Sequence, residues 1–205
     1  INISMSSVYY RLSDYKGMLF HLEKVINSGD FIPYDLCNYG YWRCFDKNWK
    51  QNDFFEYGKF VEKNLDEYPQ NQLVKLSNTK NKKINLGILS ADLKSDHSIT
   101  FFLKTILSNY NKDDVEIYLF SNQINIDSIS TEISALVHKT IDISKLNDSN
   151  ALNKIRQFNL DIMIDVMGYT SRNRIGLFKN RVAKKQVLWL GYCNTIGLKN
   201  MDYII

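Results

Sequence analysis

Apolar residues between positions 81 and 205 recur in short runs, and longer amphipathic segments lie between most of these runs. The runs are rich in β-branched and aliphatic residues, which is typical of strands buried on both faces of a parallel sheet. Alternation of strand and helix with short joints indicates right-handed crossovers. The pattern therefore predicts an α/β fold, a Rossmann-like doubly wound parallel sheet. Strands are expected at 84–90, 115–121, 139–143, 160–166, 185–190 and 201–205, and helices within 99–110, 128–138, 149–159 and 172–180.

The first 80 residues have helical spacing instead. Between Leu12 and Ser28 the apolar residues fall mostly three or four positions apart, with Ser13 as the expected N-cap and Gly29 as the stop. A second helix, rich in aromatic residues, is expected within 46–65. An aromatic stripe at helical spacing is more typical of core packing than of a binding surface. We therefore expect a helical appendage at the start of the chain.

A polar run that contains Pro69 predicts a linker over Tyr68–Lys83. The expected division is a helical appendage with its linker at residues 1–80 and a Rossmann-like lobe at residues 81–205. Strand and helix alternate only in the second part, so the predicted sheet belongs to it alone.

Composition allows a sizeable core and gives little reason to expect a strongly charged partner. The 205 residues (24.0 kDa) are 44% hydrophobic, and 26 basic against 22 acidic residues give a formal charge of +4. The one dense basic cluster, at 80–83, is more typical of a solvated linker than of a nucleic-acid site. No apolar run approaches the roughly 20 residues of a membrane span. We expect neither a nucleic acid nor a membrane as partner.

Three cysteines, Cys37, Cys44 and Cys193, make an odd count and have neither CxxC nor metal-ligand spacing. This usage suits a reducing compartment, so we expect a cytoplasmic protein and no bound metal. The sequence opens on Ile1 and closes on an apolar MDYII segment. These ends predict a piece of a longer polypeptide.

The segment KINLGILSADLKSDH, residues 83–97, runs from an apolar strand into a polar loop with an aspartate and a histidine. Ligands of open α/β sheets bind at the carboxyl ends of such strands, so Asp92 and His97 are candidate site residues. A structural role is the alternative, because acidic residues after strands often cap helices. Ser95 or Asp96 could equally cap a helix that starts near Ser98.

Two further strand ends carry polar residues and glycines. LDIMIDVMGYTSRNR passes Asp165 and then a Gly-Tyr-Thr turn ending at Thr170, and VLWLGYCNT passes Leu190 and Gly191. Glycines there let backbone approach a ligand closely, although each alone is more typical of a turn. Together with the loop that carries Asp92 and His97, these make three polar strand ends on one edge of the sheet, which favours a ligand site there. Neither a GxGxxG nor a GxxxxGK[ST] loop follows the first strand, which argues against dinucleotide oxidoreductases and phosphate-loop NTPases.

Three blocks of the sequence resemble the O-GlcNAc transferase and SPINDLY family of glycosyltransferases. They are ILSADLKSDHSITFFL, DVMGYTSRNRIGLF and QVLWLGYCNTIGLKNMDYII, in that order. The last is the most diagnostic, because W-L-G-Y, a threonine-containing glycine loop and M-D-Y-I-I occur together. The resemblance covers residues 83–205 well and extends weakly over YYRLSDYKGMLFHL and FIPYDL.

The resemblance implies a GT-B enzyme, in which two Rossmann-like lobes face each other across a cleft. This chain would be the N-terminal lobe, and the C-terminal lobe, which supplies most contacts to UDP in the family, would be missing. Tetratricopeptide repeats usually precede the family's catalytic region. The chain has no 34-residue self-similarity, so any such repeats are expected before Ile1.

The family transfers N-acetylglucosamine from UDP-GlcNAc to Ser or Thr hydroxyls of proteins with inversion, and no metal or other cofactor is expected. By resemblance, His97 binds the donor sugar or the acceptor hydroxyl, and Asp92 orients it or relays the proton; the general base stays open. The resemblance also implies substrate binding by further residues of the three loops. These are Ser98, Ile99, Thr170, Leu190 and Gly191.

Several positions depart from the family pattern. Members commonly have one residue fewer between the aspartate and the histidine, and often have Pro and Thr where Ser98 and Ile99 stand. Cys193-Asn194 replaces a Pro-Gly pair. A histidine that some members carry upstream is not found, and Asp35 or Leu36 occupies that neighbourhood. These departures bear on the identity of the sugar more than on the fold.

Two other functions stay open at this point. A degenerate, non-catalytic lobe could serve as a protein-interaction module, although Asp92, His97, Thr170 and the LGY loop together argue against decay. The parent enzyme could also transfer a related sugar, or act on a glycan. The isolated 205 residues are expected to be inactive in transfer, because half of the donor site would be absent.

Overall fold

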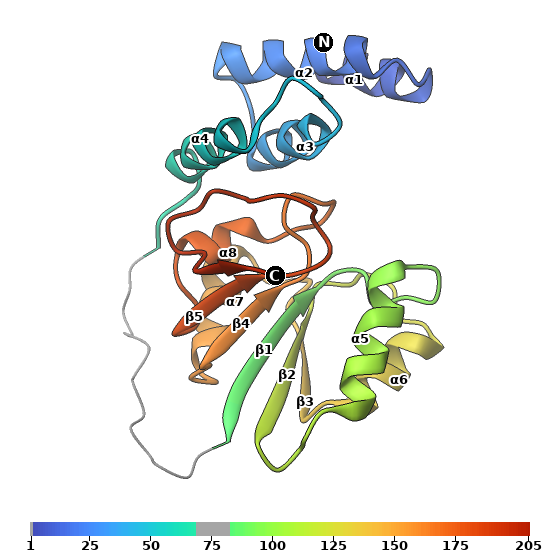
Figure 1. The fold of residues 1–205 in the computed structure, drawn as a ribbon, viewed down its shortest axis with the longest axis vertical. Coiled ribbons are helices and arrows are strands. Elements are labelled where there is room, and N and C mark those ends of the chain that lie inside the picture. The colour runs from blue at the N-terminus through green and yellow to red at the C-terminus, as the bar shows by residue number, and fades with distance from the viewer. Residues whose placement is uncertain (1, 69–82) are drawn as a thin grey trace.

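The computed structural model describes residues 2–68 and 83–205. Most of the predicted linker, Tyr68–Lys83, therefore lies outside the described residues. The described part consists of helices at the start of the chain and a six-stranded sheet with its own helices (Figure 1).

All strands of the sheet are parallel, in the order β3-β2-β1-β4-β5-β6. The chain first adds strands on one side of β1 and then returns to its other side, so the order reverses between β1 and β4. Such a reversal is the point at which open α/β sheets bind ligands. The strands are β1 Ile84–Ser90, β2 Val115–Ser121, β3 Lys139–Asp142, β4 Ile162–Asp165, β5 Lys185–Leu188 and β6 Tyr203–Ile204.

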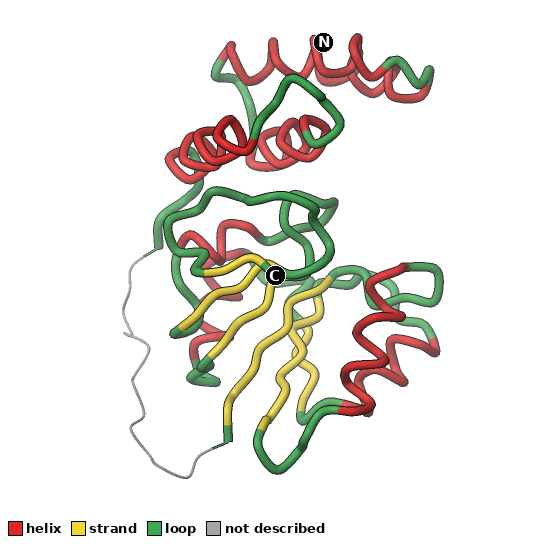
Figure 2. Tube along the Cα trace, viewed as in Figure 1, coloured by secondary structure: helices red, strands yellow, loops and turns green. Residues whose placement is uncertain are grey.

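Helices connect the strands and cover the sheet. Each helix of the lobe falls within a segment that the sequence predicts as helical, apart from one residue at the start of two of them. In Figure 1, α5 and α6 lie on one side of the β1–β3 half, and α7 and α8 lie with β4 and β5. The secondary-structure colouring of Figure 2 shows the same alternation. The helices are α5 Ser98–Asn109, α6 Ser128–Leu136, α7 Asp148–Arg156 and α8 Ile175–Lys179.

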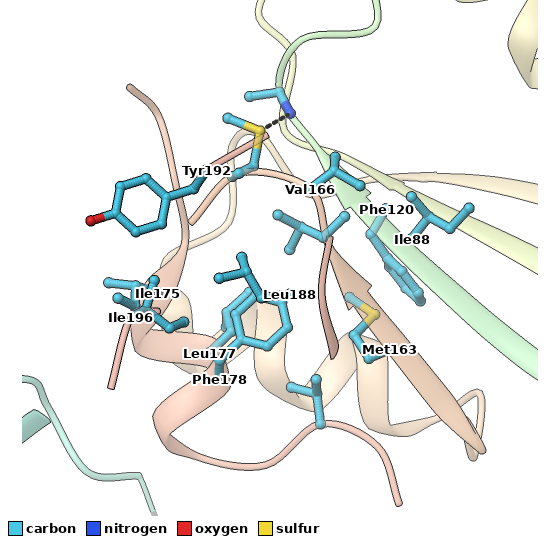
Figure 3. Packing of buried hydrophobic residues seen from close by; sticks show 14 of the residues in the cluster. Ile88, Phe120, Met163, Val166, Ile175, Leu177, Phe178, Leu188, Tyr192 and Ile196 are labelled. Atoms are coloured by element: carbon cyan, nitrogen blue, oxygen red, sulfur yellow. Dashed lines mark hydrogen bonds between the residues drawn. The ribbon is translucent and has the colours of Figure 1, made fainter. Parts of the chain in front are cut away.

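The core of the lobe lies where the sheet meets these helices. Leu89 of β1 and Phe120 of β2 are fully buried, and each such side chain contributes roughly 1.5–3 kcal/mol of burial free energy. Gly87 stands in β1 because Met163 and Leu160 occupy the space of a side chain. Figure 3 shows this packing around Ile88, Phe120, Met163, Val166, Ile175, Leu177, Phe178, Leu188, Tyr192 and Ile196.

The helical part has two consecutive helix hairpins. In Figure 1, α1 and α2 form an outer layer, and α3 and α4 lie between that layer and the sheet. Successive helices contact one another along the series. The helices are α1 Asn2–Arg11, α2 Tyr15–Ser28, α3 Pro33–Arg43 and α4 Gln51–Lys63.

The sequence predicts α2 and α4 but not α1 and α3. The expected N-cap of α2, Ser13, is wrong: Asp14 caps the helix by accepting the backbone N–H of Gly17 at 3.0 Å. Ser13 has a φ of +57° and makes the turn from α1 instead. Gly29 ends α2 in the left-handed region, as predicted.

Helices α3 and α4 rest on loops at the carboxyl edge of the sheet. The Tyr192 hydroxyl donates to the carbonyl of Gly40 at 3.3 Å, and the backbone N–H of Lys199 donates to Glu62 at 3.2 Å. Gly58 lies against the backbone of Gly197, where any side chain would overlap it. The helical part therefore covers the same edge at which the site residues were expected. Among the described residues, no helix is long and apolar enough to cross a membrane.

Candidate functional site

The loop between β1 and α5 brings the first two candidate residues together. Oδ2 of Asp92 lies 3.7 Å from Nε2 of His97. The Asp92 side chain is 19% exposed and that of His97 is 35% exposed, so both reach solvent from a partly enclosed position. This separation is longer than a good hydrogen bond and leaves each group able to meet a ligand atom.

Backbone contacts hold this loop in place. The Thr100 hydroxyl donates to the carbonyl of Asp92 at 3.0 Å and accepts the N–H of Lys94 at 3.0 Å. The N–H of Asp92 donates to the Ser90 hydroxyl at 3.1 Å. The start of α5 and the end of β1 are therefore tied to the loop that connects them.

A second set of contacts fixes the outer side of the loop. The carbonyl of Leu93 accepts hydrogen bonds from Gln123 and Ser130, both at 2.7 Å. Asp127 accepts the N–H groups of Ser130 and Ser95, each at 2.8 Å, and these hydrogen bonds lower the pKa of its carboxyl group. The loop with Asp92 and His97 is thus anchored to the β2–α6 connection on the neighbouring strand.

His97 itself caps α5, in place of Ser95 or Asp96, which the sequence offered as alternatives. Its Nδ1 accepts the N–H of Ile99 at 3.4 Å, and its backbone is extended. A neutral imidazole has one N–H, and Nδ1 acts here as an acceptor. We infer that the hydrogen of the neutral ring lies on Nε2, the nitrogen that faces Asp92. His97 therefore presents a hydrogen-bond donor to the site.

The loop after β4 is shaped by a buried carboxylate. Asp165 is 1% exposed, and its two oxygens accept the N–H groups of Met167 at 2.9 Å and Gly168 at 3.1 Å. Burial raises the pKa of Asp165 to about 6, against the opposing effect of these hydrogen bonds. Gly168 takes a φ of +55° beside the Tyr192 ring, and the Thr170 hydroxyl donates to the Met167 carbonyl at 2.7 Å.

The loop after β5 turns sharply against the loop after β4. Leu190 has a φ of +71°, a conformation that residues with a Cβ rarely adopt. Gly191 follows it, and a Cβ there would overlap the carbonyl oxygen of Val166. The glycine is thus required by close approach of the two loops.

The three loops line one cavity of about 360 Å³. All seven residues singled out from the sequence face it, so the structure brings them together. Tyr41, Phe102 and Val166 also line it and were not predicted as site residues. Tyr41 belongs to α3, which the sequence pattern did not reveal. Phe102 could have been noticed as an aromatic residue on the polar face of the predicted helix, and in α5 the residue is 54% exposed.

A second cavity, of about 530 Å³, shares Asp92, His97 and Thr170 with the first and extends beneath the helical part. Hydroxyl, amide and aromatic groups of α1 and α3 line its far side, among them Ser7, Tyr34, Asn38, Tyr41 and Trp42. The candidate site therefore continues from the sheet edge into the space between the sheet and the helices. No group of three or more metal-ligating side chains is assembled within 2–68 and 83–205.

A protein-family model described as glycosyl transferase family 41 matches residues 59–205. The chain belongs to this family. The match confirms the resemblance drawn from the three sequence blocks, and it covers the whole sheet and all three loops of the site.

Several known proteins are similar to this family 41 chain. A probable UDP-N-acetylglucosamine–peptide N-acetylglucosaminyltransferase SPINDLY from Solanum lycopersicum is 28% identical over 142 residues, 67% of this chain and 15% of the relative. A UDP-N-acetylglucosamine–peptide N-acetylglucosaminyltransferase from Caenorhabditis elegans is 31% identical over 127 residues, 60% of this chain and 11% of the relative. The chain thus spans less than a sixth of the length of either protein.

The fold is similar to that of a solved O-GlcNAc transferase from Thermobaculum terrenum, a K341M mutant. The TM-score is 0.87 at 18% identity, over 99% of this chain and 39% of that one. This likeness concerns the fold. It confirms the predicted α/β class and the Rossmann-like lobe of a GT-B glycosyltransferase, and it includes the helices at the start of the family 41 chain.

Proposed function

We propose that this chain forms one wall of the catalytic cleft of a protein O-GlcNAc transferase, which transfers N-acetylglucosamine from UDP-GlcNAc to Ser or Thr hydroxyls with inversion. The observation that carries the proposal is the shared cavity: Asp92, His97, Thr170 and Gly191 come from three separate loops and line it together. It lies at the carboxyl edge of a sheet of family 41, close to the reversal of strand order.

His97 is proposed to hold the acceptor hydroxyl or the donor sugar. Inversion requires the hydroxyl to attack the anomeric carbon from the face opposite to the departing diphosphate, and to lose its proton as the bond forms. With Nδ1 engaged by the N–H of Ile99, the Nε2–H of His97 is suited to donate to an oxygen. Removal of a proton at Nε2 would first require the ring to give up that contact.

Asp92 is proposed to orient the imidazole and to take part in relay of the proton. Its Oδ2 is 3.7 Å from Nε2 of His97, and the anchored loop backbone limits the movement of both residues. Such preorganisation matters because a misplacement of about 1 Å can cost a factor of 100 in rate. The identity of the general base is left open by this assignment.

The remaining site residues are proposed to shape the sugar subsite. Leu190 and Gly191 line the cavity, and their backbone is proposed to lie against the sugar. Thr170 contributes to the floor, with its hydroxyl hydrogen engaged by Met167. Ser98 and Ile99 present the first turn of α5 to the same space. No cofactor other than the UDP-sugar substrate is required by this scheme.

The complete enzyme is proposed to need a second lobe for the nucleotide. The resemblance assigns most UDP contacts to that lobe, and the curated relatives are several times longer than this chain. We therefore expect no transfer by residues 1–205 alone. The acceptor would be a protein segment that reaches the cleft past the helices of the larger cavity.

The proposal is tested by transfer assays on the full-length parent with UDP-GlcNAc and a serine-rich acceptor protein. His97→Ala is expected to lower kcat/KM by about 100-fold or more, because the acceptor or sugar oxygen would lose the donor that positions it. His138→Ala is the matched control, because His138 is an exposed histidine that precedes β3 at the opposite edge of the sheet. Equal transfer by wild type and His97→Ala would remove His97 from the mechanism.

A further inference from the structure

Two of the three cysteines lie where the helical part meets a loop of the candidate site. Cys44 follows α3 and is partly buried, and Cys193 is exposed in the loop after β5. The sequence alone does not show that the two segments meet, because α3 lies near the start of the chain and the loop lies near its end. Cys193 stands two residues after Gly191, which lines the proposed sugar subsite.

Direct contacts place Cys44 against the loop that carries Cys193. The Cys44 thiol donates to the Tyr192 hydroxyl at 3.2 Å, and that hydroxyl donates in turn to the carbonyl of Gly40 in α3 at 3.3 Å. Tyr192 is the immediate neighbour of Cys193. The end of α3 and this loop are thus already joined by a chain of hydrogen bonds that includes one of the sulfur atoms.

The electrostatics of this region agree with the placement that these hydrogen bonds give. Burial raises the pKa of Cys44 to about 12, and the neighbouring Cys193 contributes to that increase. The pKa of Tyr41 is raised by burial and further by Cys193 and Cys44. Tyr41 also lines the cavity that holds His97.

We propose that Cys193 and Cys44 form a reversible oxidation site that joins α3 to the loop of the sugar subsite. The oxidant is a low-molecular-weight disulfide, such as oxidised glutathione. The Cys193 thiolate attacks one of its sulfurs and releases one thiol, which leaves a mixed disulfide on Cys193. The Cys44 thiolate then attacks the Cys193 sulfur and releases the second thiol. Two protein thiols are oxidised, one small disulfide is reduced to two thiols, and both protons leave on them.

The order of the two steps follows from exposure. Cys193 is open to solvent, so a small disulfide can reach it, whereas Cys44 is partly enclosed by Tyr192 and Gly40. The attacking species is the thiolate, and only a small fraction of Cys44 is ionised near neutral pH. Closure of the protein disulfide is therefore the slow step, and its rate should rise about tenfold per pH unit.

The third cysteine serves as an internal control. Cys37 is buried in α3, and its thiol donates to Asn173 at 3.5 Å. Cys37 borders the larger cavity but is buried, so an oxidation that is selective for the exposed Cys193 should leave it unmodified. The proposed site is independent of the transferase assignment, because it depends only on the two thiols and on their accessibility.

The test is a peptide map of the oxidised 205-residue chain. The chain is incubated at low concentration with oxidised glutathione, remaining thiols are blocked, and proteolytic peptides are analysed by mass spectrometry without reduction. The expected product is an intramolecular Cys44–Cys193 linked peptide that forms in wild type and equally in Cys37→Ser. Cys44→Ser should instead retain glutathione on Cys193, because the resolving thiol is absent.

Three results of the peptide map would overturn the proposal. One is a stable glutathione adduct on Cys193 of the wild type in the same yield as in Cys44→Ser. The others are a linked peptide that contains Cys37 and a Cys193–Cys193 link between two chains. The wild-type map decides the question even if a variant fails to fold, and closure that does not accelerate with pH would contradict Cys44 as the resolving thiol.

Discussion

His97 combines a structural and a chemical role in one side chain. Its Nδ1 caps α5, and its Nε2 faces Asp92 and the cavity. The two roles are linked, because the cap determines which nitrogen carries the hydrogen of the neutral ring. A substitution that removes the imidazole should therefore affect stability as well as chemistry, and the two effects need separate measurements.

We predict that His97→Ala lowers the free energy of unfolding by about 0.5–2 kcal/mol, the usual cost of losing an N-cap. His97→Asn should recover most of this stability, because asparagine is a good N-cap and its oxygen can accept the N–H of Ile99. Urea denaturation of the chain measures both values. Identical stability of wild type and His97→Ala would show that the ring nitrogen does not cap α5.

Asp165 should make stability fall as pH rises. The ordinary pKa of an aspartate is about 3.8. Burial disfavours the charged form and raises the pKa of Asp165 to about 6 in the folded chain. The folded state therefore binds more protons between these two values. The contribution of Asp165 is fully present below about pH 4 and is lost as pH rises through about 6, with a total of roughly 3 kcal/mol.

Asp165→Asn tests this sign, because the amide cannot ionise. We expect wild type to lose stability relative to the variant between about pH 4 and pH 6, and the difference to be constant above that range. Denaturation curves of both proteins across this interval give the measurement. The variant also loses one acceptor for the Met167 and Gly168 N–H groups, which is a pH-independent offset. Parallel pH profiles would contradict a titrating, buried Asp165.

Among the elements, those buried on both faces were the most predictable from sequence. The bounds of β1 and β2 agree with the predicted runs, because these short segments are mostly apolar and rich in residues that favour strands. The predicted strands at 160–166 and 201–205 are longer than the observed β4 and β6. Their extra residues lie in the loops on either side. Apolar residues in a sequence indicate which positions are buried. Buried positions can continue beyond the last hydrogen bond that pairs two strands, so the predicted strand is too long.

Helices α1 and α3 were missed for a different reason. Much of α1 is exposed and polar, and α3 begins at Pro33 and contains glycine and several aromatic residues, so neither shows a clear apolar stripe. Packing between the layers stabilises them in place of local propensity. Tyr41 was missed as a site residue for the same reason, since no single stretch of sequence shows that α3 reaches the cavity.

The loops after β4 and β5 depend on close backbone contact. We predict that Gly191→Ala destabilises the chain by about 2–3 kcal/mol or more, because a Cβ would overlap the Val166 carbonyl oxygen and the loops would have to separate. Gly29→Ala is the matched control, since Gly29 has a φ of +75° but open space around it, and should cost about 1–2 kcal/mol. Thermal or urea unfolding compares the two. A smaller loss for Gly191→Ala than for Gly29→Ala would contradict the close approach.

In the whole molecule, the helical part and the sheet share one buried apolar cluster. Leu22 and Leu36 of the helices belong to it together with Leu89 of β1. The larger cavity lies between these parts, so its shape depends on how α1 and α3 sit over the sheet edge. The gathering of the three loops could be predicted from the sequence, because parallel strands end at one edge. The helical side of the site could not, because it depends on packing between distant segments.

The account depends on the sugar of UDP-GlcNAc occupying the cavity between the three loops. The most direct measurement is a structure of the full-length parent with UDP-GlcNAc bound. We predict that the sugar lies against the backbone of Leu190 and Gly191, with an oxygen of the sugar or of the acceptor within hydrogen-bond distance of Nε2 of His97. A sugar bound elsewhere, with this cavity empty, would contradict the account.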